Sequence, residues 1–245
     1  MKLYVRLLNP DAEAPAIAKA LTNTSIRVAA EAGQVTLFTD TLVEGNLEAT
    51  NYSLIREIWF RVHELIAIIN GAGLVHGGAI NRLNLVYVDY ENSEGKRALM
   101  PNVADGDIVL PGLRTSIPDT APFIALALKD RAVAKALRLF VPDSDWVNLY
   151  RIFEIIRHEV PTERIEAAGW ATNKEIDAFT HCANDPAITG DFARHGQLPA
   201  GRNKLVRQSP RKPAQLNTLS LAMARHLVGR LLRAWLNHKV TVPGP

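Results

Sequence analysis

The densest group of side chains that could carry out chemistry lies between residues 179 and 196. It holds two histidines, His181 and His195, and Arg194 stands beside the second. Histidine exchanges protons near neutral pH, and arginine stabilises the charge that develops on a phosphate during hydrolysis. His181, Arg194 and His195 are therefore the candidate catalytic residues of a metal-independent ribonuclease or nucleotide hydrolase.

The same segment also has a purely structural interpretation. Asn184 and Arg194 would satisfy free groups at helix ends, and Asp191 would pair with Arg194 in a hydrogen-bonded plug. Turns between helices often need caps of this kind, which favours the plug over the catalytic site. Both interpretations stay open, so the residues alone do not decide whether the chain is an enzyme.

Motifs for cofactors, metals and nucleophiles are weak in this sequence. The glycines of residues 71–78 follow a predicted helix, the reverse of the order in a dinucleotide-binding loop, so we interpret them as a helix C-cap and turn. The carboxylate pairs in 105–107 and 143–145 fit a turn and a helix cap, because no His or Glu lies near either pair. Cys182, the single cysteine, fits a small buried hydrophobe. We expect no cofactor and no metal.

Two stretches of the C-terminal part carry a family resemblance. One is Ala183-Asn184-Asp185-Pro186 followed by Gly190-Asp191-Phe192-Ala193-Arg194-His195, and the other is Trp146-x-x-Leu149-Tyr150-x-x-Phe153-Glu154. The chain resembles a group of uncharacterised bacterial proteins with an Ala-Asn-x-Pro … Gly-Asp-x-Ala-Arg-His stretch between two C-terminal helices. Asp185 departs from the pattern, which often has His there. The resemblance implies family membership and no particular activity.

Charge is distributed unevenly along the 245 residues, although the formal net charge is only +3. Residues 1–140 carry 14 basic and 15 acidic side chains, and residues 141–191 carry 4 basic and 10 acidic ones. Residues 192–245 carry 10 basic side chains and no acidic one. The last 54 residues are therefore a block of positive charge.

This basic block has two competing explanations. Cations in a loop and on one helix face suit phosphate binding, because each neutralised phosphate releases counterions. Alternatively, the block docks on the acidic residues of 141–191, and the pattern needs no ligand. The candidate nucleic-acid-binding residues are the loop cations Arg202, Lys204, Arg207, Arg211 and Lys212, with Arg230 and Arg233 on the final helix.

The first 140 residues have the pattern of a mixed α/β domain. Strands are predicted where apolar and polar residues alternate or β-branched residues gather, at 2–8, 34–39, 83–90 and 107–110. Helices are predicted where apolar residues recur at helical spacing or Ala and Leu dominate, at 11–21, 51–70 and 123–140.

Beyond Pro142 only helical patterns remain. Helices are predicted from Trp146 to Val160, at 162–168, at 172–183 and at 218–237, and residues 196–217 are predicted as a loop. On the final helix His226, Arg230, Arg233 and Asn237 share one polar face. The fold class is therefore α+β, with a mixed α/β domain over residues 1–140 followed by an all-α domain over residues 141–245.

We expect a polyanion-binding protein, with nucleic acid as the first candidate ligand, that acts through its basic C-terminal helical part. The alternatives are the hydrolase described above and a protein-interaction or regulatory module whose charges pair internally. The opening residues lack the pattern of a signal peptide and no 18 residues in a row are apolar, so a cytoplasmic protein without a membrane partner is expected. The pattern specifies neither a protein partner nor a homo-oligomer.

Overall fold

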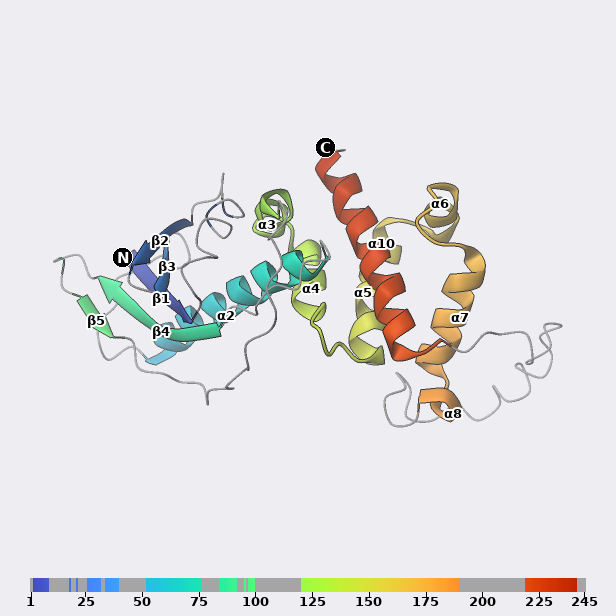
Figure 1. Ribbon diagram of the computed structural model, residues 1–245, viewed down its shortest axis with the longest axis horizontal. Helices are drawn as coiled ribbons and strands as arrows, with labels where there is room; N and C mark the ends of the chain where they lie inside the picture. Colours follow the sequence, from blue (N-terminus) through green and yellow to red (C-terminus); the bar gives the residue numbers. More distant parts are fainter. Residues whose placement is uncertain are drawn as a thin grey trace. The chain divides into compact units, whose positions relative to one another are not determined.

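The computed structural model describes two compact units, Met1–Arg138 and Leu139–Pro245, and we treat each by itself (Figure 1). The residues described are 2–8, 18, 21, 26–31, 34–39, 52–75, 84–91, 95, 97–99, 120–189 and 219–241. The helix expected at 11–21, apart from Ala18 and Leu21, and the strand expected at 107–110 lie outside them.

The N-terminal unit contains an antiparallel sheet in the order β2-β3-β1-β4-β5. The strands are β1 (Lys2–Leu8), β2 (Arg27–Glu31), β3 (Gln34–Thr39), β4 (Asn84–Glu91) and β5 (Arg97–Leu99). The central strand β1 buries Leu3 and Val5, as its alternating pattern predicts. Tyr4 is buried as well: its ring meets Phe38 edge to face, and its hydroxyl donates to Glu91 at 2.5 Å.

A 24-residue helix, α2 (Tyr52–Val75), packs against β4 and against α3 (Ala121–Ala127). Its apolar stripe, which includes Ile58, Val62 and Ile69, is buried. The segment 56–75 is long enough and apolar enough to cross a membrane, and 61% of it is buried inside the structure. A core helix of a folded unit has the same properties.

The glycine interpretation at residues 71–78 is wrong at its first two positions. Gly71 and Gly73 lie inside α2, which continues to Val75. The reason for a glycine at 71 is close packing: a Cβ there would lie 2.0 Å from the backbone oxygen of Leu137. Leu137 belongs to α4 (Arg131–Leu139). The close contact between α2 and α4 therefore requires a glycine at position 71, and the residues around Gly71 in the sequence do not predict that contact.

The single helix expected over residues 123–140 is in fact two. Helix α3 ends at Ala127 and α4 begins at Arg131. Asp130 separates them, and its Oδ1 accepts from the backbone N–H groups of Ala132 and Val133 at 2.8 and 3.2 Å. A carboxylate in this position caps the second helix, which is why the Ala/Leu-rich run divides here.

The described part of the C-terminal unit is helical, which confirms the α+β fold class. Its helices are α5 (Trp146–Glu159), α6 (Thr162–Ala167), α7 (Asn173–Asn184), α8 (Pro186–Thr189) and α10 (Leu221–Thr241). Helix α5 packs against both α10 and α7 (Figure 1). The core between these helices contains three fully buried aromatic residues, Phe153, Phe179 and Trp235. The rings of Phe153 and Phe179 meet edge to face, with their centroids 5.6 Å apart.

The cap expected at 143–145 is in place, and the final helix has a cap of the same kind. Asp145 accepts from the Asn148 N–H at 2.7 Å and begins α5. Ser220 accepts from the Met223 N–H at 3.2 Å and begins α10. Arg225 links α10 to the turn before α5, because its Nε donates to the Ser144 carbonyl at 2.8 Å.

Candidate functional site

Three of the predicted site residues lie in the part of the chain that the structure describes: His181, Arg230 and Arg233. The other seven lie outside the described residues: Arg194, His195, Arg202, Lys204, Arg207, Arg211 and Lys212.

His181 lies in the last turn of α7 and is partly buried. Its Nε2 lies 3.9 Å from Asp185 Oδ2, which is too long for a hydrogen bond. The next residue, Cys182, is fully buried, and its Sγ accepts from the Leu219 N–H at 3.3 Å. Cys182 is therefore a packed core residue that also contacts the start of the α10 segment.

Asn184 makes a contact of the kind that the plug interpretation expects. Its Nδ2 donates to the Thr180 carbonyl at 2.7 Å, near the C-terminal end of α7. Its Oδ1 is buried and has no hydrogen-bond donor among the described residues. The expected partners of the plug, Asp191 and Arg194, lie outside them.

Two cations of α10 bind carboxylates on other helices of the same unit. Arg230 Nη2 lies 2.6 Å from Glu175 Oε1, and Lys239 Nζ lies 2.7 Å from Glu159 Oε2. Glu159 also accepts from Trp235 Nε1 at 3.2 Å. For Arg230 and Lys239, the internal pairing of the basic block with the acidic helices is thus observed.

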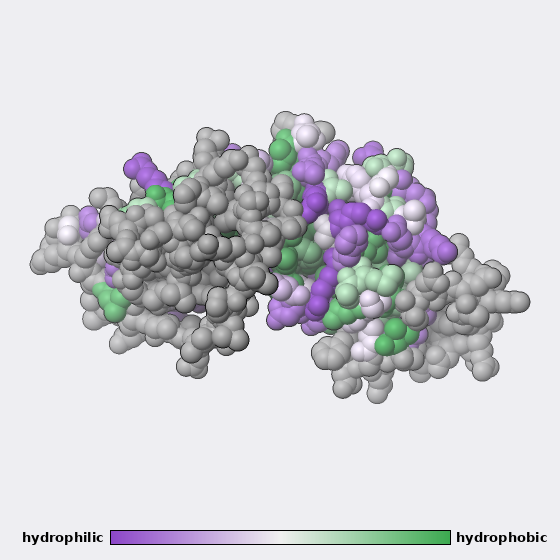
Figure 2. Space-filling view, viewed as in Figure 1, coloured by the Kyte–Doolittle hydropathy of each residue, from purple (hydrophilic) through white to green (hydrophobic). Residues whose placement is uncertain are grey.

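The exposed polar face of α10 is present as predicted. His226, Arg230, Arg233 and Asn237 are all exposed, whereas Leu227 and Leu231 on the opposite side are buried. Figure 2 shows that the face of the helical unit in view mixes hydrophilic and apolar residues and has no single apolar patch over the described part.

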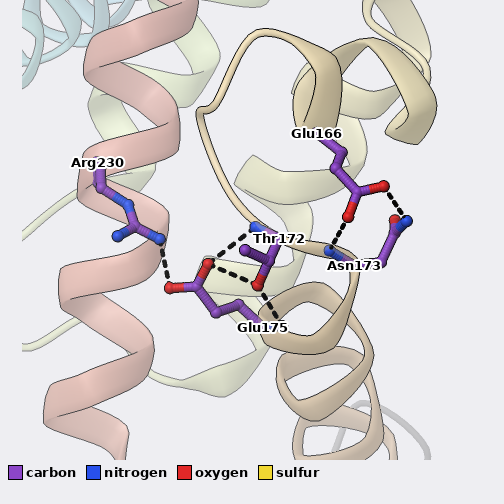
Figure 3. A network of polar contacts seen from close by, with 5 residues as sticks. All are labelled: Glu166, Thr172, Asn173, Glu175 and Arg230. Carbon is purple, nitrogen blue, oxygen red and sulfur yellow. Dashed lines mark hydrogen bonds and ion pairs between the residues drawn. The ribbon is translucent and has the colours of Figure 1, made fainter.

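Glu175 connects the start of α7 to α10 (Figure 3). It forms a capping box with Thr172, in which the Glu175 N–H donates to Thr172 Oγ1 at 3.2 Å and Glu175 Oε2 accepts from the Thr172 N–H at 2.8 Å. Its other carboxylate oxygen binds Arg230. The Thr172 backbone hydrogen bond and the Arg230 guanidinium hold the pKa of Glu175 below its ordinary value.

The link between α6 and α7 is fixed at both ends. At the end of α6, Gly169 adopts a left-handed φ of 69°, its N–H donates to the Glu166 carbonyl at 2.9 Å, and the Trp170 N–H donates to the Ile165 carbonyl at 3.0 Å. These two bonds form a Schellman motif. At the start of α7, the Glu166 carboxylate accepts from both the backbone N–H and the side-chain amide of Asn173 (Figure 3).

Trp170, in the link between α6 and α7, lines a pocket on the helical unit. The pocket has a volume of about 730 Å³ and lies where the ends of α5, α6 and α10 meet. We call it the Trp170 pocket; its polar and aromatic lining residues are Glu159, Arg164, Trp170, Asn237, His238 and Thr241. The ring of Trp170 meets that of His238 edge to face, with centroids 5.7 Å apart.

Sequence reasoning missed the Trp170 pocket. Gly169 fits a helix-ending residue, but no local pattern shows that the indole of Trp170 stays partly exposed beside His238, which lies 68 residues later along the chain. A usable signal is the aromatic residue directly after a helix-ending glycine. Among the described residues, no group of three or more His, Cys, Asp or Glu side chains could hold a metal ion.

Comparison with known proteins gives no relative. No protein-family model, no curated protein sequence and no solved structure matches this chain.

Proposed function

We propose that this protein binds a polyanion, with nucleic acid as the first candidate, through the basic residues of segment 201–213. The observation that carries the proposal is a run of six basic residues and no acidic one in residues 192–218, while the charges of the described helices are close to balance. Arg230 and Lys239 are held by Glu175 and Glu159, so cations of the final helix are used within the folded unit.

The remaining charge is concentrated in one stretch. The described residues of the helical unit, 139–189 and 219–241, contain eight Lys and Arg side chains against nine Asp and Glu, so they are close to balance. Residues 192–218, which connect α8 to α10 along the chain, contain six basic residues and no acidic one. The excess positive charge of the C-terminal half therefore belongs to this stretch.

A concentrated run of cations without acidic residues is suited to phosphates. Each Lys or Arg that contacts a phosphate displaces condensed counterions, and the gain in their entropy drives binding. In this proposal Arg202, Lys204, Arg207, Arg211 and Lys212 contact the phosphates, and Arg230 is assigned to the structure of the unit because Glu175 already holds it. Arg233, which is exposed on α10, stays among the candidate phosphate contacts.

The test replaces the five cations of segment 201–213 together with glutamine and measures affinity for an oligonucleotide over a range of salt concentrations. We expect the native protein to lose affinity steeply with salt and the variant to show a slope shallower by up to about five, since each phosphate contact contributes about 0.7 to 0.9. A native slope near zero would overturn the proposal.

The control is a variant that loses the same number of positive charges outside segment 201–213. Five exposed cations of the described residues serve: Lys129, Arg131, Lys135, Arg151 and Lys174, each replaced by glutamine. This control variant should keep most of the native slope. Equal losses in both variants would mean that net charge, and not a binding segment, is responsible.

A further inference from the structure

We propose that the Trp170 pocket holds an unpaired nucleobase, so that the nucleic acid bound is single-stranded. This inference rests on the proposed function and specifies the form of its ligand. The inference rests on three features of the pocket: its volume, the partly exposed indole of Trp170, and Arg164, a cation whose side chain has no partner among the described residues.

The size of the pocket is that of a small-ligand site. Sites for small molecules range from about 300 to 1,000 Å³ and combine apolar walls with a few polar groups. The Trp170 pocket has a volume of about 730 Å³, and Ala167, Ala168 and Ala234 form part of its apolar wall. A nucleobase with its ribose fits a pocket of this volume, and a base that is paired within a duplex cannot enter a concave site.

The indole of Trp170 differs from the other tryptophans of the chain. All four tryptophans are among the described residues; Trp59, Trp146 and Trp235 are buried, and Trp170 is partly exposed. Burial in a core explains the first three side chains. Proteins that bind single strands use exposed aromatic rings as platforms on which bases stack.

The backbone that carries this indole is held in place on both sides before any ligand binds. The Schellman motif at Gly169 holds the Trp170 backbone on one side, and the capping box of Thr172 and Glu175 holds the chain on the other. Arg230 then attaches this link to α10, the helix that supplies His238 to the pocket (Figure 3). Because the backbone is already ordered and the ring already contacts His238, stacking of a base on Trp170 costs less conformational entropy than it would on a flexible loop.

The charge of the pocket suits a phosphate next to the base. The negative charge of Glu159 is matched by Lys239 at 2.7 Å. Arg164 is exposed and has no hydrogen bond or ion pair from its side chain among the described residues. Its guanidinium is therefore available to the phosphate attached to a bound nucleoside, and the exposed Asn237 amide can donate to or accept from a base edge.

The first test compares a labelled single-stranded oligonucleotide with the duplex of the same sequence by fluorescence anisotropy. We expect the native protein to prefer the single strand. Trp170→Ala should weaken single-strand binding about tenfold and leave duplex binding and the salt slope unchanged, because stacking is not an ionic contact. Met223→Ala is the matched control, since Met223 is 56% exposed on α10 and does not line the pocket.

A second variant keeps the test informative if Trp170→Ala does not fold, as judged by circular dichroism. Arg164→Gln changes an exposed side chain of α6. It should weaken single-strand binding and lower the salt slope by about one, because it removes one phosphate contact. Unchanged affinity in Arg164→Gln together with equal native binding of single strand and duplex would overturn the inference.

The third test measures ligand binding in the Trp170 pocket through the tryptophan fluorescence of the protein. Titration with adenosine monophosphate should quench the emission to saturation, and Trp170→Phe should abolish this quenching. Inorganic phosphate alone should not quench; the same saturable response to phosphate would show an anion site and overturn the assignment to a base.

The outcomes separate the two proposals. Salt-dependent binding that is equal for both strands and insensitive to Trp170→Ala would overturn the base pocket and leave the proposed function standing. Absence of salt-dependent binding to either form would overturn the proposed function. The base pocket, which rests on that function, would be overturned with it.

Discussion

One carboxylate, that of Glu175, joins two helices of the helical unit in addition to their packed core. Glu175 accepts from the backbone of Thr172 with one carboxylate oxygen and from Arg230 with the other. The same carboxylate therefore caps α7 and holds α10. A change at either partner is expected to affect both the start of one helix and the position of another.

The capping hydroxyl gives the first prediction at this scale. Thr172→Ala removes the acceptor for the Glu175 N–H, so we expect the free energy of unfolding to fall by about 1 kcal/mol. Urea denaturation measures this change. Thr241→Ala is the control, because its hydroxyl donates only to carbonyls at the exposed end of α10. Equal losses in the two variants would contradict the role of the cap.

The lowered pKa of Glu175 gives the second prediction. A carboxyl group whose pKa is lower in the folded than in the unfolded protein stabilises the fold above its ordinary value of 4.5, and this contribution is lost as the pH falls through the lower folded value. We expect Glu175→Gln to reduce the acid-dependent loss of stability below pH 4.5. Melting temperatures of the native protein and the variant over that range measure the effect; parallel curves would contradict it.

At the scale of whole elements, two glycines allow close contacts in helices. A Cβ at Gly71 in α2 would meet the Leu137 backbone, whereas a Cβ at Gly229 in α10 would lie 2.8 Å from the Phe140 ring. Backbone atoms of a packed helix cannot move aside easily, but an aromatic ring can shift. The two positions should therefore respond differently to the same substitution.

This difference gives the third prediction. Gly71→Ala should lower the free energy of unfolding by about 1–3 kcal/mol, although alanine favours a helix by about 1 kcal/mol over glycine. In Gly229→Ala the same helix preference offsets the smaller clash, so stability should stay within about 1 kcal/mol of the native protein. Thermal denaturation of both variants measures this. A larger loss at 229 than at 71 would contradict the packing argument.

Elements with a strong local signal were predictable. Strands β1 and β3 and helices α5 and α6 match their patterns, because alternation, caps and the Gly169 stop are properties of neighbouring residues. Strand β2 was missed because Arg27–Glu31 has no clear alternation, and its strand conformation depends on pairing with β3.

The site was less predictable than the fold. Helical periodicity correctly placed Arg230 on an exposed face, but its partner Glu175 lies 55 residues earlier, and only the packed helices bring the two together. The Trp170 pocket is formed by the ends of three helices that are far apart along the chain. Sequence patterns report local preference and burial, and they do not report which helix ends meet.

At the scale of the whole molecule, the charge distribution gives the fourth prediction. Protein purified at low salt should carry nucleic acid and show a raised 260/280 nm absorbance ratio, and a high-salt wash should lower the ratio, because salt weakens phosphate contacts. The four tryptophans provide a strong 280 nm reference. The five-cation glutamine variant should show a normal ratio at low salt. A low ratio in the native protein before any wash would contradict the prediction.

The hydrogen bond between Leu219 and Cys182 has a consequence for how motion in this protein can be followed. The thiol is the only one in the chain, it is fully buried in α7, and it touches the residue that leads into α10. Its rate of alkylation therefore measures how often the entry to the final helix opens. The native sequence thus contains its own kinetic probe of local unfolding, in contact with Leu219, the residue that follows the basic stretch 192–218 along the chain. We expect a ligand bound to that stretch to slow the alkylation.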